Sequence, residues 1–332
     1  MSTAPTLYGD ISPEVAGSVS KQLLERGMPT LIADQFGQSQ ALKEHGTTLL
    51  NFFRYNALPS DPTELVEGVS PAGRKLTRTK ISVRVKQYGD FVPISDVVLD
   101  TADDTVLQGA IDVLSQQSAE MSEKIILNEL KAGTNVVYAG NVASRALVAS
   151  VFSDTELKRV VRVLLKQNAG KVTSRVRSTA AYGMENVHPA FIALVPAELI
   201  SAVRALTGFV DAKDYGQISP YPTEIGAWNE IRFLYHTLLT GWADTGSGTA
   251  GGTLLSTTGT NCDVFPIVIF GANAWANVAL RGEFAITPTV RNPKPAPGDE
   301  LGQTGSVGWK MMKAAKILND AFMVRVETAA PV

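Results

Sequence analysis

Two glycine-containing patterns in the sequence could hold a phosphate group, and each lacks a feature that this chemistry requires. The segment GSGTAG at 246–251 matches the G-x-G-x-x-G fingerprint of dinucleotide-binding loops, in which a helix begins at the glycines and holds the pyrophosphate. Gly252 and a tract of Thr and Ser follow instead, which is typical of a surface loop. The segment NAGKVTS at 168–174 contains Gly-Lys, but it has no glycine at position 165 and no Ser or Thr directly after Lys171.

The residue types that bind metals or attack substrates are few and scattered. The three histidines, His45, His188 and His236, have no partner at the i, i+4 spacing of metal-binding helices. Cys262 is the only cysteine, so it has no disulfide partner within the chain, and a free cysteine is usually a buried small hydrophobe. We therefore predict no catalytic, cofactor-binding or metal-binding residues, and we expect that the protein is not an enzyme.

The composition is that of a globular protein. The chain has 332 residues, 45% of them hydrophobic, which is enough for one large domain or two ordinary ones. The formal net charge of -2 argues against a protein that coats nucleic acid, although a local basic patch stays possible. The N-terminus lacks the basic region of a signal peptide, and the most apolar stretch, from Phe265, is too short for a membrane span. We expect a soluble protein, made in a cytoplasm, that does not enter a membrane.

One strand-like segment, 77–96, separates charge from apolar residues. Arg78, Lys80, Arg84 and Lys86 fall on one face with Ser82 between them, whereas Thr77, Thr79, Ile81, Val83 and Val85 fall on the other. Three interpretations are open: the cationic face follows phosphates, it is a solvated face that protects an edge strand, or it meets an acidic surface. A two-stranded excursion of this kind is marginal alone, so it needs a surface to rest on.

The elements that must position this strand mix helices and strands without a strict βαβ rhythm, so we predict the α+β class. An acidic helix is predicted from Asp103 to Lys131 and a second helix over 153–171, which Ser153 caps. A short helix is predicted at 12–27, inside an N-terminal arm of about the first 46 residues. Strands are predicted at FIALV, AWNEIRFLYHTLL and FPIVIFG. The segment GWKMMKAAKILNDAFMVRVETA is predicted as a strand pair near the C-terminus, with a helix as the alternative for part of it.

Several segments resemble the major capsid protein family of podoviruses related to phage N-four, which has the Hong Kong 97 type coat fold. The segments are FRYNALP, LVEGVSPAG, LTRT and KQYGDFVPISD in the first third, then EIGAWNEIRFLYH and VGWKMMKAAKILNDAFMVRVE. The resemblance implies a structural coat subunit that assembles into the icosahedral head of a tailed bacteriophage around double-stranded DNA. Two alternatives stay open: an encapsulin-like compartment shell, or a cytosolic nucleotide-binding enzyme that uses the loop 246–252.

The resemblance also implies a domain layout and a set of partners. The layout is an N-terminal arm at 1–47, an extended β-hairpin loop at 48–95, a peripheral domain at 96–185 and 300–332 with spine helix 103–131, and an axial domain at 186–299. The partners are other copies in hexamers and pentamers, a portal, and a separate scaffolding protein, because the arm is short; a decoration protein is an optional further partner. Packaged DNA would be touched without sequence preference, and assembly would occur in the host cytoplasm.

Charge then suggests how copies meet. We expect the basic hairpin of one copy to contact acidic residues on its neighbour, because the acidic helix directly follows the hairpin and a neighbour's helix is easier to reach. The expected contact residues are Arg74, Lys75, Arg78, Lys80, Arg84 and Lys86 on the hairpin, and Asp100, Asp103, Asp104, Asp112 and Glu120 on the acidic segment.

Overall fold

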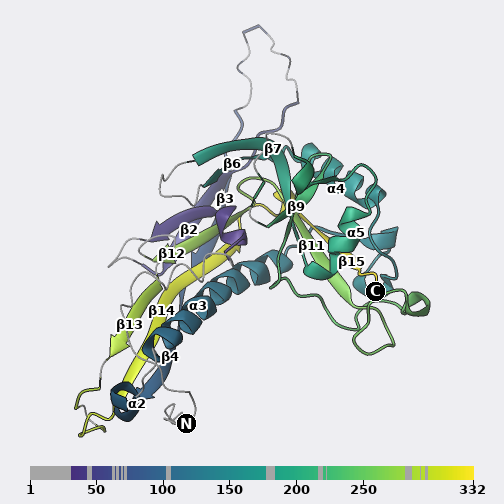
Figure 1. Ribbon diagram of the computed structural model, residues 1–332. Helices are drawn as coiled ribbons and strands as arrows, with labels where there is room; N and C mark the ends of the chain where they lie inside the picture. Colours follow the sequence, from purple (N-terminus) through teal and green to yellow (C-terminus); the bar gives the residue numbers. More distant parts are fainter. Residues whose placement is uncertain are drawn as a thin grey trace.

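The computed structural model has an elongated part and a broader part (Figure 1). Helix α3 lies along a five-stranded sheet in the elongated part, and an eight-stranded sheet with shorter helices forms the rest. This mixture confirms the predicted α+β class. The described residues are 31–42, 47–61, 64, 67–68, 70, 73–101, 106–176, 184–215, 220–221, 223–280, 286–291, 293–295 and 298–332.

The five-stranded sheet is organised around one long strand, β14. Strand β4 pairs with one edge of β14, while β12 and β13 share the other edge, all antiparallel. Strand β1 extends the sheet by pairing parallel with β12, so this part of the predicted arm is built into the body. The strands are β1 (Gln38–Leu42), β4 (Lys86–Ser95), β12 (Trp275–Leu280), β13 (Ile286–Arg291) and β14 (Thr304–Ile317).

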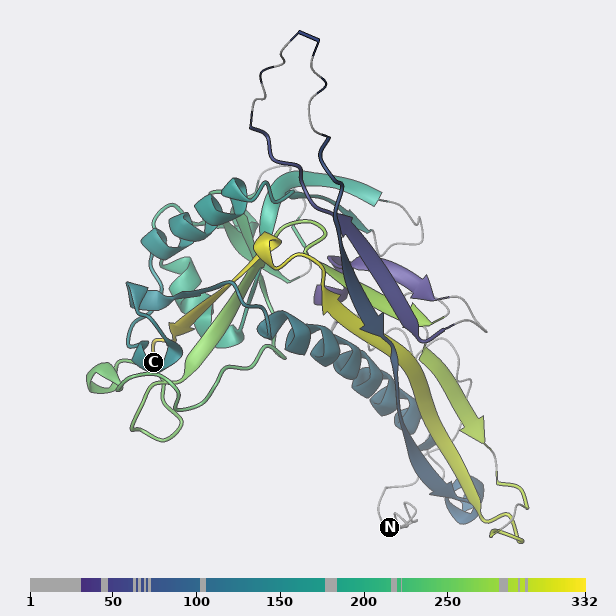
Figure 2. The same ribbon diagram turned by 180° about the vertical axis from the view of Figure 1, so that it is seen from behind.

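Alternate side chains of β14 face two different partners, because successive residues of a strand point to opposite faces. Trp309 and Met311 pack against α3 (Val106–Lys131). Met312 and Ala314 pack instead with the hairpin of β2 (Leu49–Tyr55) and β3 (Arg78–Arg84). The elongated part is thus three layers deep, with α3 on one face of the sheet and the base of the hairpin on the other (Figure 2).

The eight-stranded sheet forms the second unit, in the order β5-β15-β11-β7-β10-β9-β8, with β6 paired to β7. Strand β11 is central, and all seven of its residues are buried. The strands are β5 (Val136–Tyr138), β6 (Val172–Val176), β7 (Met184–Val195), β8 (Val210–Asp211), β9 (Glu224–Trp228), β10 (Ile231–Tyr235), β11 (Val264–Phe270) and β15 (Met323–Ala329). The remaining helices are α2 (Asp96–Thr101), α4 (Asp154–Lys166), α5 (Ile200–Arg204) and short 3-10 turns, of which η2 (Ala33–Gln35) matters below.

Each face of the eight-stranded sheet has its own apolar core. Phe191, Phe233 and Ile267 pack on the face that α4 and α5 cover. Ile192 and Phe270 point the other way, toward a cluster that includes the C-terminal half of α3 and Trp275 of the five-stranded sheet. Helix α3 therefore ties the two units together.

Several predicted elements are confirmed, with changed boundaries. Helix α4 has a capping box, in which the Ser153 N–H donates to Glu156 Oε2 at 2.9 Å, and Leu157, Val160 and Leu164 are buried. The long acidic helix is α2 followed by α3, with 102–105 outside the described residues. The predicted strand at AWNEIRFLYHTLL is a hairpin that turns at Asn229, where φ is 50°. The helix predicted at 12–27 also lies outside the described residues.

The predicted strand pair near the C-terminus is wrong as a pair. β14 and β15 are both strands, but one belongs to each sheet. The two sheets also divide the chain differently from the predicted peripheral and axial segments. β12 and β13 lie in the sheet that α3 covers, whereas β5, β6 and β15 lie in the eight-stranded sheet.

Candidate functional site: the cationic hairpin

Only part of the cationic face predicted for 77–96 is present as one face. Arg78, Lys80 and Arg84 lie on β3, whereas Lys86 lies on β4 directly opposite Lys313, on the side of the sheet that α3 covers. β3 ends at Arg84 and β4 begins at Lys86, so the segment leaves the hairpin and enters the five-stranded sheet at Val85. Arg78, Lys80, Arg84 and Lys86 are all exposed, and within the described part of the chain none of them forms an ion pair. These cations are therefore available for a partner outside the chain.

The apolar face of β3 rests on its own subunit. Val83 and Val85 are 3% and 4% exposed, and they pack with Leu42 of β1 and Val278 of β12. The described residues that follow β2 and precede β3 extend away from the body (Figure 2). Arg74 links these two segments, because its guanidinium donates to the carbonyls of Pro59 and Asp61. The base of the hairpin therefore packs within the subunit, and only the part beyond it projects.

The predicted acidic partners are not brought to the hairpin within one chain. Asp112 and Glu120 lie half-buried on α3, on the other side of the five-stranded sheet from the hairpin. Glu120 accepts a hydrogen bond from Gln116 at 2.9 Å and lies 3.8 Å from Lys124 Nζ. Asp100 lies in α2, while Asp103 and Asp104 are outside the described residues.

A buried ionic network at the junction of the two units was not predicted. The Glu123 carboxylate accepts the backbone N–H groups of Ala33 and Asp34 at 3.1 and 3.2 Å, and it lies 3.0 Å from His236 Nε2. Because the Leu238 N–H donates to His236 Nδ1, a neutral His236 carries its proton on Nε2 and donates to Glu123. The sequence does carry a signal for this network. At helical spacing, Glu123 falls on the same buried side of α3 as Ile126, Leu127 and Leu130.

A second buried network fixes the end of α3 to β15. Glu327, fully buried, accepts bonds from Arg145 Nε at 2.6 Å and Arg325 Nε at 2.8 Å. Arg325 also donates to the Gly133 carbonyl at 2.9 Å, which satisfies a carbonyl just beyond the helix end. Burial, together with the nearby charges of Arg145 and Arg325, lowers the pKa of Lys131. Both networks position elements, and we assign them no chemistry.

Among the described residues, the cysteine and histidine side chains that could support catalysis are buried or lie apart from one another. Cys262 is completely buried and its thiol donates to the Val148 carbonyl at 3.2 Å, and burial raises the pKa of that thiol, which makes it a poor nucleophile. His188 is exposed, His236 is buried, and His45 lies outside the described residues. No group of three or more metal-binding side chains occurs in the part of the chain that the structure describes.

The loop that contains GSGTAG is held together by its own polar groups. Asp263 accepts the Asp244 N–H at 2.8 Å and the Thr257 hydroxyl at 2.7 Å. The three-residue turn η7 (Ala250–Gly252), which contains the last glycine of the pattern, stands where a helix would have to begin, so no helix holds a phosphate here.

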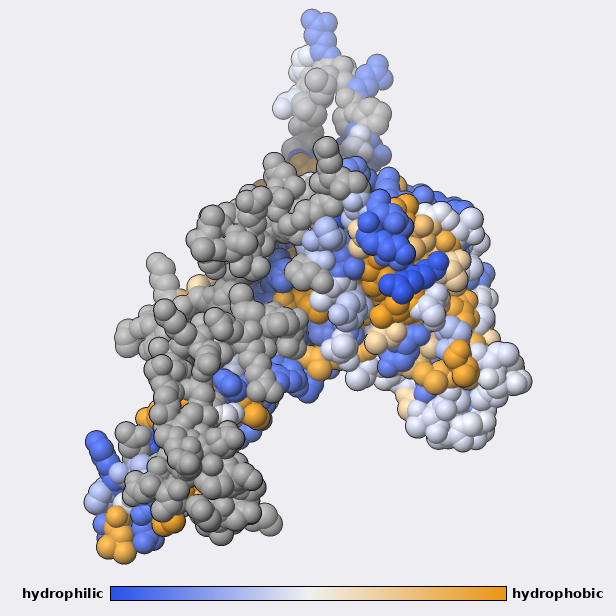
Figure 3. Space-filling model, in the orientation of Figure 1, coloured by the Kyte–Doolittle hydropathy of each residue, from blue (hydrophilic) through white to orange (hydrophobic). Residues whose placement is uncertain are grey.

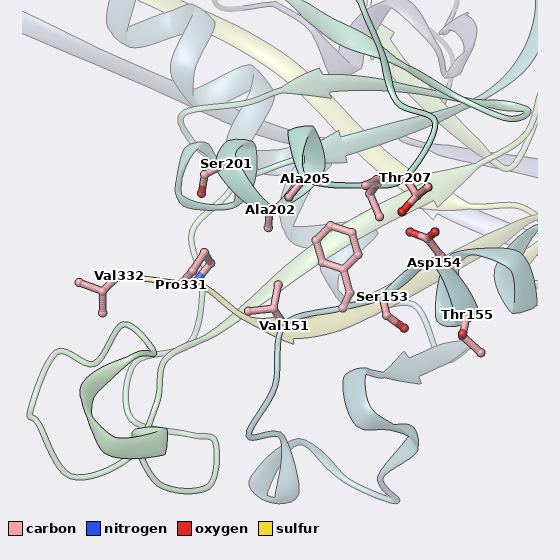
Figure 4. A pocket seen from close by; sticks show the side chains of 12 residues that line it. Val151, Ser153, Asp154, Thr155, Ser201, Ala202, Ala205, Thr207, Pro331 and Val332 are labelled. Atoms are coloured by element: carbon pink, nitrogen blue, oxygen red, sulfur yellow. The ribbon is translucent and has the colours of Figure 1, made fainter.

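One open groove of about 590 Å³ lies between the first turn of α4, α5 and the C-terminal residues (Figure 4). Its polar lining is mainly the hydroxyls of Ser153, Thr155, Ser201 and Thr207, and Asp154 supplies the ionisable side chain. Asp154 stands in the first turn of α4, where a carboxylate complements the helix dipole. A single carboxylate without a base, nucleophile or second acid does not form a catalytic site. Over α4, the surface mixes hydrophilic and hydrophobic residues (Figure 3).

None of the described helices is both long enough and apolar enough to cross a membrane.

The matches to known protein families and solved structures are to phage capsid and head proteins. The sequence profile of a family described as phage capsid protein matches residues 78–326. The capsid of Ralstonia phage GP4 superimposes with a TM-score of 0.70 at 13% identity, covering 100% of this chain and 99% of that chain. The head of Helicobacter pylori bacteriophage KHP40 gives 0.62 at 11% identity, covering 97% and 96%. The capsid of cyanophage Pam1 gives 0.59 at 13% identity, covering 100% of both. A search of curated proteins finds no match.

Proposed function

The chain belongs to the phage capsid protein family and is a structural, non-enzymatic major capsid protein that self-assembles into the shell of a virion; from this premise we propose that its cationic hairpin binds an acidic surface of the next copy. Its fold is of the Hong Kong 97 type, as predicted. The narrower relationship to podoviruses related to phage N-four stays a prediction.

The observation that carries the proposal is the separation of opposite charges onto the two sides of one chain. Among the described residues, Arg78, Lys80 and Arg84 on the hairpin form no ion pair with a carboxylate, and the acidic side of α3 lies beyond the sheet. Each exposed ion pair contributes only about 0 to 1 kcal/mol, so one contact stays reversible. Many such contacts in a closed shell act together, because each additional one forms between copies already held close.

The proposed contact set is the full predicted one. On the hairpin it comprises Arg74, Lys75, Arg78, Lys80, Arg84 and Lys86, and on the neighbour Asp100, Asp103, Asp104, Asp112 and Glu120. In the proposed layout the projecting loop within 48–95 reaches the adjacent copy. The five-stranded sheet with α3 is the peripheral unit, and the eight-stranded sheet is the axial unit that surrounds the centres of hexamers and pentamers.

Further partners belong to the proposal as well. We propose that a separate scaffolding protein and a portal are partners, with a decoration protein as an optional one. We propose that the icosahedral shell assembles in the host cytoplasm and then receives double-stranded DNA. The net charge of -2 supports a wall that touches packaged DNA without sequence preference and does not hold it tightly.

Charge reversal tests the contact. Replacing Arg78, Lys80, Arg84 and Lys86 together by Glu should leave a folded subunit, judged by circular dichroism, that forms no shells in size-exclusion chromatography and electron microscopy. Adding Asp112→Lys and Glu120→Lys to that variant should restore part of the assembly, because the charges are then exchanged. Normal shells from the fourfold variant would refute the charge argument.

A further inference from the structure

The outer face of the hairpin carries aromatic side chains as well as cations. The antiparallel register places Tyr55 opposite Arg78 and Phe53 opposite Lys80. Residues directly opposite in an antiparallel pair point to the same side, so both aromatic rings share the cationic face. Phe53 is 49% exposed and Tyr55 63%, and the Arg78 guanidinium lies 4.4 Å from the centre of the Phe53 ring.

This face has the composition of a protein contact rather than of a merely solvated strand. A solvated protective face carries charges alone, whereas exposed Phe and Tyr beside Arg are the residue types that anchor protein interfaces. At the centre of the face two polar side chains bind each other, because the Ser82 hydroxyl donates a hydrogen bond to Asn51 Oδ1 at 2.8 Å. The aromatic rings at the end near the projecting loop therefore form its apolar part.

The same chain carries a surface that matches this face. On the outward side of α3, Asp112, Gln116 and Glu120 follow one another at four-residue spacing and so lie along one stripe. Val113 lies beside this stripe and is 59% exposed, although the neighbouring Ile111 and Leu114 are buried against the sheet. An apolar residue flanked by acids complements aromatic rings flanked by cations.

The two surfaces cannot meet within one subunit. Met311 of β14 faces α3 and Met312 faces the hairpin, so the five-stranded sheet separates them. The outer face of the hairpin and the outward stripe of α3 point away from each other on opposite sides of three layers. Two different surfaces on opposite sides of one chain pair head to tail, which generates rings when the rotation closes.

We infer that Phe53 and Tyr55 are the apolar anchors of the contact between copies, and that the stripe of α3 around Val113 on a second copy receives them. The inference rests on the proposed charge contact and adds to it: the cations guide the approach, and the aromatic rings hold it. Single-stranded nucleic acid is the other partner that binds aromatic rings beside cations, so the test includes it.

The first test removes the rings and keeps every charge. The Phe53→Ser, Tyr55→Ser double variant should fold, and the protein concentration at which shells first form should rise more than about tenfold. Leu165→Ser is the matched control, because Leu165 of α4 is 47% exposed but lies on the other unit. Normal assembly of the double variant would overturn the inference while leaving the charge-reversal result, and hence the proposed function, standing.

The second test locates the partner surface. A Phe53→Cys, Val113→Cys variant should form disulfide-linked ladders of dimers and larger species on mild oxidation of shells, and each single variant should not. The native Cys262 is completely buried and does not compete. Pairing Phe53→Cys with Leu165→Cys should give no ladder. Absence of a ladder from the first pair, or a ladder of equal strength from the control pair, would overturn the assigned partner surface.

The third measurement separates a nucleic-acid partner from a protein partner. Fluorescently labelled oligothymidylate should bind the unassembled wild-type subunit no more tightly than it binds the double serine variant. Binding that depends on the two rings, combined with unchanged assembly, would overturn the inference in favour of a nucleic-acid surface.

Discussion

Lys313 of β14 and Asp34 of η2 form a buried ion pair, with Nζ 2.7 Å from Oδ1, although 279 residues separate them in the chain. The same ammonium group donates to Ser122 of α3, and Asn277 of β12 donates to the same carboxylate oxygen. Four elements therefore meet around one pair of charges. This arrangement makes the segment that precedes β1 part of the folded body.

Lys313→Ala should destabilise the subunit by about 3 to 5 kcal/mol, because it leaves the Asp34 carboxylate buried without its cation. Lys316→Ala is the matched control on the same strand. Lys316 pairs with Glu129 at 2.6 Å, but its side chain is 45% exposed, so its loss should cost no more than about 1 kcal/mol. Urea unfolding of unassembled subunits measures the free energy of unfolding of both variants. Equal losses would show that other groups stabilise the Asp34 carboxylate when Lys313 is absent.

Glu123→Gln should loosen residues 31–42 without unfolding the subunit. The amide that replaces one carboxylate oxygen would present a donor to the Ala33 and Asp34 N–H groups or to His236, which costs about 1 to 3 kcal/mol. Hydrogen exchange followed by mass spectrometry should show faster exchange in this segment. Glu129→Gln, also on α3, should leave the segment protected, and unchanged exchange in Glu123→Gln would contradict the assigned role.

The sequence predicts those elements whose pattern is local. The helical period identified α4, and the alternation of 77–96 identified which side of β3 is buried, since Val83 and Val85 are indeed covered. Local pattern does not name a strand's partner, which is why β14 and β15 were paired wrongly. Charged residue types also suggest exposure, so the burial of Glu123 and Glu327 was missed, although the phase of Glu123 on α3 indicated it.

Local pattern predicts only the cationic half of the candidate surface. The cations follow from the alternation within one strand, whereas Phe53 and Tyr55 join them only through the register between β2 and β3. Register depends on how the hairpin packs against the sheet beneath it, through Val83, Val85 and Val278. The aromatic half of the surface therefore needed the structure.

Acid should weaken the loop that contains GSGTAG. Burial raises the pKa of Asp263, but hydrogen bonds from the Thr257 hydroxyl and the Asp244 N–H outweigh burial, so the net pKa lies below its usual value. The stabilisation is present above the carboxyl's unfolded pKa of about 3.9 and is lost as the pH falls through the lower folded value. Asp263→Asn should therefore cost about 1 to 3 kcal/mol at neutral pH and progressively less below about pH 4.

Unfolding of wild type and Asp263→Asn across this pH range measures the difference. Asp214→Asn, at an exposed position, is the control and should change stability by less than about 0.5 kcal/mol. A cost of Asp263→Asn that grows as the pH falls would contradict the assigned direction.

Two glycine-to-alanine substitutions should change stability in opposite directions. Gly109 lies inside α3 and a methyl group there would meet nothing within 4 Å, so Gly109→Ala should stabilise the subunit by about 0.5 to 1 kcal/mol through helix propensity. Gly37 precedes β1, and its added methyl would lie 2.6 Å from an atom of the buried Trp275 ring. That ring is packed between the two units and has little room to move, so Gly37→Ala should cost about 1 to 3 kcal/mol. Thermal unfolding of both variants should therefore move the midpoint up for Gly109→Ala and down for Gly37→Ala; a neutral Gly37→Ala would show that the segment before β1 does not press on Trp275.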